Sequence, residues 1–429
     1  MIELLIGLLF LLIFLSVPVS FAIAISAIAI MIIDPTLTPL LFVQRTFAGL
    51  NSFVILAIPL FVLTAEIMNA SGLTDRLIKC SYAMVGHLRG GLAQVNILVS
   101  LIFAGISGSA TADTAGMGSM LIPAMIKRKY PKDFTIAVTA TSSTLGQIIP
   151  PKIIAVIYAA TVGISVGALF LAGIMAGIII CLSMMTIAYI FDKKRGYPRE
   201  EKMSTKERIV AIVTALPPVV TPIIVIGGIF SGFFTATEAA VISTLYALIL
   251  SICYRSMTPK KIWIALSKAG KMTAVTAFCI GAANTFGFLL AIYRFPQTVA
   301  TFISNYIHHP TVFLLFVFLI FLLVGSFLDA TPCVILLAPI IATAADAIGG
   351  INPIHLGAIV VLTMALGLVT PPYGLCALIA CKIADYPMQK TFKVMSVFIA
   401  ANIAIIILFI FVPDIILFIP RTFAPHFMP

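Results

Sequence analysis

The sequence predicts an all-α polytopic membrane protein built from inverted repeats, with two re-entrant hairpins and two broken helices. Three observations support this prediction: the composition, polar interruptions between flanks of like charge, and a proline motif that occurs twice. Of the 429 residues, 61% are hydrophobic and 10% are charged, and the mean hydropathy is +1.18. Soluble domains carry about 25% charged residues, so this composition excludes a water-exposed globule.

The apolar runs are long enough to cross a bilayer, because a hydrocarbon core of about 30 Å needs roughly 20 helical residues. The first run, from Leu4 to Ile33, contains no charged residue. It lacks a basic beginning and a small-residue cleavage site, which indicates a retained span rather than a signal peptide. It forms either one long tilted span or two short spans that part at Pro18. The side on which the N-terminus lies depends on that choice.

The net charge of +11 comes from basic residues in short connections between apolar runs. This is the positive-inside pattern, so we expect a multi-pass protein of the bacterial inner membrane and no nucleic acid partner. The basic, cytoplasmic connections are residues 76–89, 127–132, 192–208, 255–271 and 382–393. The seven cysteines form no CxxC pair and the five histidines lack ligand spacing, which argues against a disulfide framework, a zinc site or a haem attachment.

One stretch between basic flanks has an unusual middle. Residues 104–113 read AGISGSATAD, a poor helix interior, and they lie between Arg89 and Lys127. Because both ends carry the cytoplasmic signal, the stretch must cross the membrane an even number of times or not at all. We therefore expect residues 91–126 to form a re-entrant hairpin that enters from the cytoplasm.

A second interruption has the opposite setting. Residues 305–310 and 349–353 contain no Lys or Arg, as expected of periplasmic loops, and GSFLDATP at 325–332 breaks the apolar run between them. Residues 312–345 are therefore predicted to form a hairpin that enters from the periplasm. One hairpin from each face indicates inverted symmetry.

The motif L-G-x-x-x-P-P follows each predicted hairpin at nearly the same offset, at 145–151 and at 366–372. Each copy lies inside an apolar run, so we expect broken helices over 134–160 and 355–380. Double prolines remove backbone donors and open the preceding turn. The carbonyl groups released in this way are hard oxygen ligands that suit Na⁺, and a broken helix survives in a membrane only where it lines a cavity or holds an ion. Single proline kinks are common structural features, but the matched pair favours a functional interpretation.

Four carboxylates, Glu66, Asp113, Glu238 and Asp329, lie within or at the edge of apolar segments, where charge is costly. Asp113 and Asp329 lie at the predicted hairpin tips. We expect them near an ion or substrate cavity, and the alternative is that they cap the second helix of each hairpin. For Glu66 and Glu238 we expect buried structural hydrogen bonds or a contact with a partner subunit.

Several motifs together resemble the large membrane subunit of tripartite ATP-independent periplasmic (TRAP) transporters, over nearly the whole chain. They are LAIPLF at 56–61, GLTDRL at 72–77, RGGLAQVN at 89–96, FAGISGSA at 103–110 and the two proline motifs. The resemblance implies a sodium-driven, elevator-type transporter that is not an enzyme and needs no organic cofactor. It also implies a separate small four-helix membrane subunit and a soluble periplasmic substrate-binding protein as partners.

The elevator resemblance divides the chain into a scaffold and a transport domain. The first scaffold helices and an amphipathic arm are expected over 1–90, and the second scaffold part with its arm over 192–311. The halves of the transport domain are expected over 91–191 and 312–393, each with one hairpin and one broken helix. A C-terminal helix is expected over 394–429.

The resemblance also implies site residues. It implies a first Na⁺ site formed largely by carbonyl groups of Ser107, Ser109, Gly146, Ile149 and Pro151. The internal symmetry then implies a second Na⁺ site from Gly325, Asp329, Thr331, Gly367 and Thr370. Substrate is expected between the hairpin tips, near Thr111, Asp113, Ser142, Ser143 and Thr144. The family often has Ser where this chain has Lys152, whose ammonium group either attracts a substrate carboxylate or extends to water.

The sequence therefore predicts Na⁺-coupled import of a small organic acid from the periplasm across the lipid bilayer. Sialic acid is the favoured substrate, by resemblance to that branch of the family, and a C4-dicarboxylate is the alternative. A passive channel would need polar residues along a continuous path, whereas polarity here is concentrated at two matched breaks. An intramembrane enzyme would need a catalytic His, Cys and Ser constellation, and these residues occur only singly.

Overall fold

The computed structural model of the protein describes residues 1–197, 202–423 and 425. The helices of the first half have these bounds: α1 Ile2–Phe14, α2 Val19–Ile33, α3 Leu40–Leu50, α4 Ala57–Ala70, α5 Leu73–Val85, α6 Gly91–Ser107, α7 Ala110–Lys127, α8 Lys132–Ser143, the 3₁₀ turn η1 Thr144–Gln147, α9 Ile153–Val162 and α10 Val166–Arg195. The helices of the second half have these bounds: α11 Thr205–Phe230, α12 Ala236–Cys253, α13 Pro259–Ile292, α14 Phe295–Tyr306, α15 Pro310–Phe327, α16 Ala330–Ile348, α17 Pro353–Gly367, α18 Leu375–Ala384, α19 Met388–Phe411 and α20 Pro413–Phe423.

Several of these helices are long and apolar enough to cross a membrane. By length and composition the described residues contain seven such helices, and the bent pair α4–α5 would make eight. The seven are α10, α11, α12, α13, α15, α16 and α19. The chain is therefore an all-helical polytopic membrane protein, as the composition predicts.

The apolar N-terminal run folds as two short helices. The helix α1 ends at Phe14, Ser16 has a left-handed φ of 63°, and α2 begins after Pro18. The two helices pack against each other, so the run turns back on itself. Of the two arrangements that the sequence leaves open, the structure has the second, with the parting at Pro18.

The two halves repeat the same order of elements. In each half an amphipathic helix (α5 or α14) precedes a helical hairpin (α6–α7 or α15–α16), and an interrupted helix follows (α8–η1–α9 or α17–α18). The arm α5 leaves α4 at an angle of 75° after Gly72, whose φ is 71°. In both interruptions the peptide bond between the two prolines is cis.

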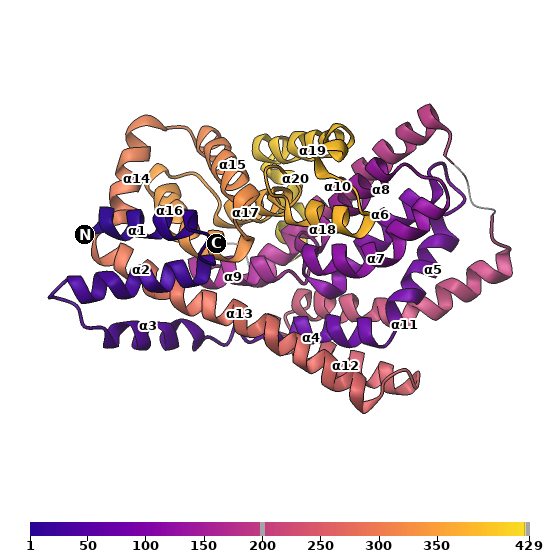
Figure 1. Ribbon diagram of the computed structural model, residues 1–429, viewed down its shortest axis with the longest axis horizontal. Helices are drawn as coiled ribbons and strands as arrows, with labels where there is room; N and C mark the ends of the chain where they lie inside the picture. Colours follow the sequence, from indigo (N-terminus) through magenta and orange to yellow (C-terminus); the bar gives the residue numbers. More distant parts are fainter. Residues whose placement is uncertain (198–201, 424, 426–429) are drawn as a thin grey trace.

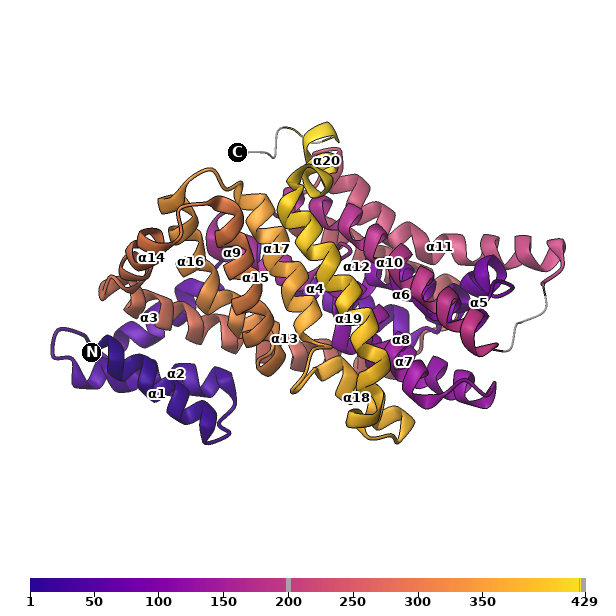
Figure 2. The ribbon, with the colours of Figure 1, turned by 90° about the horizontal axis from the view of Figure 1, so that it is seen from above.

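The two halves differ in one helix, which is continuous in the second half and divided in the first. The 34-residue helix α13 is continuous, whereas its counterpart in the first half is divided into α3 and α4, with non-helical backbone over 51–56. Figure 1 shows α3, α4, α12 and α13 along one edge of the molecule, with α17, α18 and α19 toward the opposite edge. Figure 2 shows α13 passing behind the C-terminal helices, beside α2 and α3 at one end.

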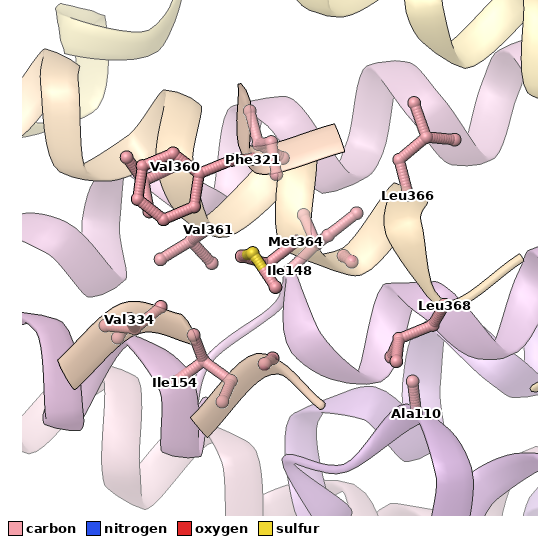
Figure 3. Packing of buried hydrophobic residues seen from close by; sticks show 14 of the residues in the cluster. Ala110, Ile148, Ile154, Phe321, Val334, Val360, Val361, Met364, Leu366 and Leu368 are labelled. Carbon is pink, nitrogen blue, oxygen red and sulfur yellow. The ribbon is translucent and has the colours of Figure 1, made fainter. Parts of the chain in front are cut away.

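The two interrupted helices share one apolar core. Ile148 from the first interruption, Met364 from α17 and Leu368 from the second interruption are all 2% exposed or less. Figure 3 shows Met364 beside Ile148, and Leu368 facing Ala110 at the start of α7. Because α17 packs against η1 and α9, and α18 packs against α7, the halves interlock through these segments.

The second hairpin touches its interruption through two glycines. A Cβ atom built on Gly367 would lie 2.7 Å from the carbonyl carbon of Gly325 and 2.8 Å from its oxygen. Real Cβ atoms essentially never come that close, so this contact requires glycine at position 367. The end of α15 and the end of α17 are thereby held against each other.

We expect the substitution Gly367→Ala to destabilise the protein, because overpacking a close contact costs about 1–3 kcal/mol. The measurement is the unfolding temperature of the purified protein in detergent, which should fall. The control is Gly270→Ala in α13, where an added Cβ meets no atom within 4 Å. Alanine is favoured over glycine inside a helix, so this variant should unfold at the same or a higher temperature. Equal unfolding temperatures in the two variants would contradict the contact.

Candidate functional site

The tip of the first hairpin closes onto the first interrupted helix. Gly108 joins α6 to α7 with a φ of 64°, and a Cβ on it would lie 2.6 Å from the carbonyl oxygen of Pro151. Ser109 begins α7, and its hydroxyl accepts a hydrogen bond of 3.4 Å from the backbone N–H of Ala112. The structure therefore brings Ser107, Ser109 and Pro151 of the implied first Na⁺ site to one place.

The carboxylate of Asp113 is the most unusual group at this contact. The residue is 0% exposed, and its Oδ2 lies 2.3 Å from the point where a Cβ of Gly146 would stand. Among the described residues no hydrogen bond of ordinary geometry reaches either carboxylate oxygen, although the side chain of Ser107 interacts with the carboxylate. Ser109 caps α7, so capping does not account for this aspartate. A buried, unpaired carboxylate costs several kcal/mol, which a bound cation or a proton would offset.

The ammonium group of Lys152 is also buried, but it lies on another side of the interruption. The residue is 1% exposed, and its Nζ lies 2.1 Å from the point where a Cβ of Gly173 in α10 would stand. The carbonyl oxygen of Ile148 lies 2.3 Å from the same point. The side chain therefore packs against the bare backbone of α10 beside a carbonyl group freed by the break. It does not extend to water.

Ile149, the remaining member of the implied first site, is 8% exposed. A Cβ on Gly177 of α10 would lie 2.2 Å from its Cδ1 atom. Its side chain therefore packs on α10, one turn beyond Lys152. The side chains of Lys152 and Ile149 thus pack against two glycines of α10, Gly173 and Gly177.

The second hairpin and interruption are built differently. Gly325 and Gly367 touch, and the N–H of Tyr373 donates a hydrogen bond of 3.3 Å to the carbonyl oxygen of Ser326. Thr331 is 9% exposed, whereas Asp329 is exposed and its side chain makes no capping hydrogen bond to α16. Of the implied second Na⁺ site, the two glycines are brought together, and the side chain of Asp329 is accessible near them.

Some of the freed backbone at the second interruption is satisfied within the chain. The hydroxyl of Thr370 donates to the carbonyl oxygen of Leu366 at 2.8 Å, and the N–H of Cys376 donates to the carbonyl oxygen of Leu368 at 2.9 Å. Fewer oxygen atoms are therefore left for an ion here. Of the two candidate ion sites, the one at the first interruption therefore has more oxygen atoms available to bind an ion.

The implied substrate residues do not form a single cavity. Ser142, Ser143 and Thr144 are 1% exposed or less, and each hydroxyl donates to a carbonyl group one turn earlier in its own helix. Thr111 is partly exposed at the hairpin tip, and its hydroxyl lies 3.2 Å from the hydroxyl of Ser109. Of this set, Thr111 is the one hydroxyl residue that the structure leaves partly accessible.

A cleft of about 570 Å³ runs beside the first hairpin, between α7 and the segments α4, α5 and α13. It is lined by Glu66, Asn69, Gly72, Thr74, Asp75, Ala112, Ala115, Gly116, Met120 and Lys268. The ammonium group of Lys268 lies 3.9 Å from the carboxylate of Glu66. The sequence gives no local signal for this cleft, because its walls come from segments about 150 residues apart.

Glu66 and Glu238 have structural contacts. Glu66 forms the ion pair with Lys268 across the cleft. Glu238 accepts a hydrogen bond of 2.7 Å from the backbone N–H of Thr235, in a capping box at the start of α12. The expectation of a buried group was wrong for Glu238, because a capping residue at a helix end remains exposed.

The donor set at the first interruption fits a monovalent cation. In the described part of the chain no three His, Cys, Asp or Glu residues are grouped as a transition-metal site would need. The candidate ligands are one carboxylate, two serine residues and backbone carbonyl groups, all of them hard oxygen donors. Oxygen-only coordination suits alkali and alkaline-earth cations, and the single carboxylate balances one positive charge.

Comparison with known proteins identifies the family. The family model "Tripartite ATP-independent periplasmic transporter, DctM component" matches residues 6–415. The chain belongs to this family. It is therefore a large permease subunit of the TRAP type, a multi-pass membrane protein of a bacterial transporter family and not an enzyme.

Relatives with different named substrates are similarly close to this DctM-family chain. The sialic acid TRAP transporter large permease protein SiaM of Vibrio cholerae is 36% identical over 414 residues, covering 96% of each chain. The C4-dicarboxylate TRAP transporter large permease protein DctM of Pseudomonas aeruginosa is 34% identical, covering 88% of each chain. The isethionate TRAP transporter permease protein DctMQ of Oleidesulfovibrio alaskensis is 32% identical, covering 94% of this chain and 64% of the relative.

Among solved structures, the YdaH transporter of Alcanivorax borkumensis superposes with a TM-score of 0.64, covering 90% of this chain and 89% of that one. The sequences are 11% identical, so the likeness concerns the fold. The arrangement of helices is therefore one that another membrane transporter also adopts.

We expect Asp113→Asn to keep the fold and to abolish stabilisation by sodium. The amide has the shape of the carboxylate but lacks its charge, so the variant should unfold at the same or a higher temperature than the wild type in sodium-free buffer. Addition of NaCl, with choline chloride as the reference, should stabilise only the wild type, because a bound ion favours the folded state by mass action.

The matched control is Asp385→Asn, which removes an exposed carboxylate in the loop after α18. This variant should respond to sodium as the wild type does. Sodium stabilisation that persists in Asp113→Asn would show that this carboxylate does not contribute to a cation site.

Proposed function

We propose that this TRAP subunit imports a small organic acid by coupling its movement to the inward flow of Na⁺. The observation that carries the proposal is the buried carboxylate of Asp113 against Gly146, at the contact between the first hairpin and the first interrupted helix. A cation in that position neutralises the carboxylate and uses the oxygen atoms that the break releases. Binding of the ion and closure of the tip are then one event.

The first Na⁺ site in this proposal consists of Ser107, Ser109, Gly146, Ile149 and Pro151, with Asp113 added to it. The second consists of Gly325, Asp329, Thr331, Gly367 and Thr370. The contact between Gly325 and Gly367 supports the second site, and the exposed Asp329 is free to turn toward an ion or a substrate. The two sites take the same place in the two halves of the repeat.

The proposed movement is that of an elevator. Residues 91–191 and 312–393 would move together as the transport domain, because each hairpin packs on its interruption and the interruptions share one core. Residues 1–90 and 192–311 would remain as the scaffold, with the arms α5 and α14. The cleft between α7 and the scaffold supports this division, since it separates the first hairpin from Glu66 and Lys268. In a channel the breaks would instead line a continuous path.

The proposed substrate is a carboxylate, with sialic acid favoured and a C4-dicarboxylate as the second candidate. SiaM is somewhat more similar to this chain than DctM is, at 36% against 34% identity. Thr111 and Lys152 are the residues best suited to meet the carboxylate, through a partly accessible hydroxyl and a buried ammonium group. Ser142, Ser143 and Thr144 would not bind the carboxylate directly, because their hydroxyls already donate to carbonyl groups within the helix.

The proposed partners are a small membrane subunit and a soluble periplasmic binding protein. Support for the first comes from the DctMQ relative, a single chain of which this one covers 64%. In that relative a further segment is joined to the part that this chain matches, and we propose that a separate chain supplies it here. The binding protein is proposed from the family alone.

The proposal is tested by uptake of labelled N-acetylneuraminate into proteoliposomes that hold this chain and its small subunit, with the binding protein outside. Uptake should require both an inward Na⁺ gradient and the binding protein. Uptake of succinate with its own binding protein would keep the mechanism and change the substrate. Uptake that is independent of sodium would contradict the coupling.

In the same assay we expect Ser107→Leu together with Ser109→Leu to abolish sodium-dependent uptake while the protein still inserts in the membrane. Both serines are nearly buried at the tip, so leucine side chains would displace an ion and prevent closure. The control is Ser119→Leu in α7, which is exposed and about three turns away from the tip. If the double variant kept normal sodium dependence, the first site would be wrongly placed.

A further inference from the structure

A second cavity lies between segments of the proposed scaffold and segments of the proposed transport domain. Its volume is about 440 Å³, and it lies between α3 and α13 of the scaffold and α9 and α16 of the proposed transport domain. It is lined mostly by small and apolar residues, with Arg45, Ser52, Thr161 and Asn284 as its polar members. Arg45 is the one charged residue in this lining.

The cavity lies beside the break in the scaffold. Ser52 and Ile55, which line it, belong to the non-helical backbone between α3 and α4. One carbonyl group of this segment, that of Phe53, accepts a hydrogen bond of 2.7 Å from the hydroxyl of Thr237. Non-helical backbone at membrane depth is tolerated where it is buried in protein or lines water, so the break supports a hydrated cavity.

The scaffold holds Arg45 in a fixed position. The side-chain amide of Asn284 donates a hydrogen bond of 2.7 Å to the carbonyl oxygen of Arg45, and the hydroxyls of Thr46 and Thr285 lie 3.2 Å apart. The guanidinium group lies over the ring of Phe288, 3.7 Å from its centre. Stacking on a ring leaves the N–H groups at the rim of the guanidinium plane free for an acceptor.

The cavity continues toward a loop with periplasmic character. Thr161 and Pro339 also line a neighbouring cavity of about 320 Å³, which reaches Ile351 in the predicted periplasmic loop. Tyr158 lines this second cavity and is 0% exposed. Its hydroxyl has no hydrogen-bond partner among the described residues. This unpaired hydroxyl is therefore enclosed within the wall of the second cavity.

We propose that these joined cavities form a carboxylate-binding vestibule, in which Arg45 receives the organic acid before it reaches the hairpin tips. The inference rests on the proposed function for the identity of its ligand. A guanidinium group presents paired N–H donors that match a carboxylate. Asp346 at the outer end adds one negative charge to the second cavity, so attraction increases from the loop toward Arg45.

The test uses a cysteine at Thr161, in a background with Cys253, the one exposed native cysteine of the described chain, replaced by Ser. Two thiol reagents of similar size, an anionic and a cationic methanethiosulfonate, are applied from the periplasmic side. The quantity measured is the ratio of the labelling rate of the anionic reagent to that of the cationic reagent. This ratio should be high when Arg45 is present. Arg45→Gln should lower this rate ratio by about tenfold or more, because both reagents respond to the lost charge with opposite sign.

Two variants serve as controls. Arg45→Lys keeps the charge and should keep most of the ratio. Arg294→Gln removes an exposed arginine at the start of α14, outside both cavities, and should leave the ratio unchanged. Added salt should reduce the ratio in the protein that retains Arg45, because salt screens the charge. This measurement tests the effect of the charge even if Arg45→Gln fails to fold.

Millimolar N-acetylneuraminate or succinate should slow the anionic reagent when Arg45 is present and not in Arg45→Gln. A cysteine that does not react, a ratio that neither Arg45→Gln nor salt changes, or a lack of protection by both acids would overturn the vestibule. The labelling requires neither sodium nor uptake. Failure of the coupling mechanism would therefore be recognised separately in the proteoliposome assay.

Discussion

The structure depends on the backbone oxygen atoms that are released where a membrane helix is broken. Such atoms find no water in the hydrocarbon core, so each needs a partner inside the protein. The protein meets this need by placing a hairpin tip on each break, at Gly108 against Pro151 and at Gly325 against Gly367. Glycine is required at positions 108 and 367, because a side chain there would separate the two backbones. In the proposed mechanism, closure of the tip and coordination of the ion are therefore the same structural feature.

The two breaks have the same architecture but a different chemistry. The first holds a buried carboxylate, Asp113, and a buried ammonium group, Lys152, whereas the second has an exposed Asp329 and an exposed Tyr373. The charges of the first break lie on different sides of it, one against Gly146 and the other against Gly173. The carboxylate can therefore serve a cation while the ammonium group serves an anion. This separation suits a protein that carries an ion and an organic acid together.

The sequence was sufficient for the class of fold, the two hairpin and break pairs, and the family, because helix breakers and charge leave local marks. The resemblance also named Ser107, Ser109 and Pro151 together, and the structure places these three residues close to one another. Other features depend on contacts between distant segments and had no local mark. The contact of Lys152 with Gly173 and the cleft at Lys268 are of this kind. Ser142, Ser143 and Thr144 looked available for substrate, but a hydroxyl inside a helix readily bonds to the carbonyl group one turn earlier.

We propose that the contact between the first hairpin and the first break holds a sodium ion. The most direct measurement is equilibrium binding of radioactive Na⁺ to the purified chain, compared between the wild type and Gly146→Ala. The added methyl group would stand 2.3 Å from the Asp113 carboxylate oxygen and displace it. We expect the variant to bind one Na⁺ fewer per chain than the wild type. An equal number of bound ions with equal affinity in both proteins would contradict it.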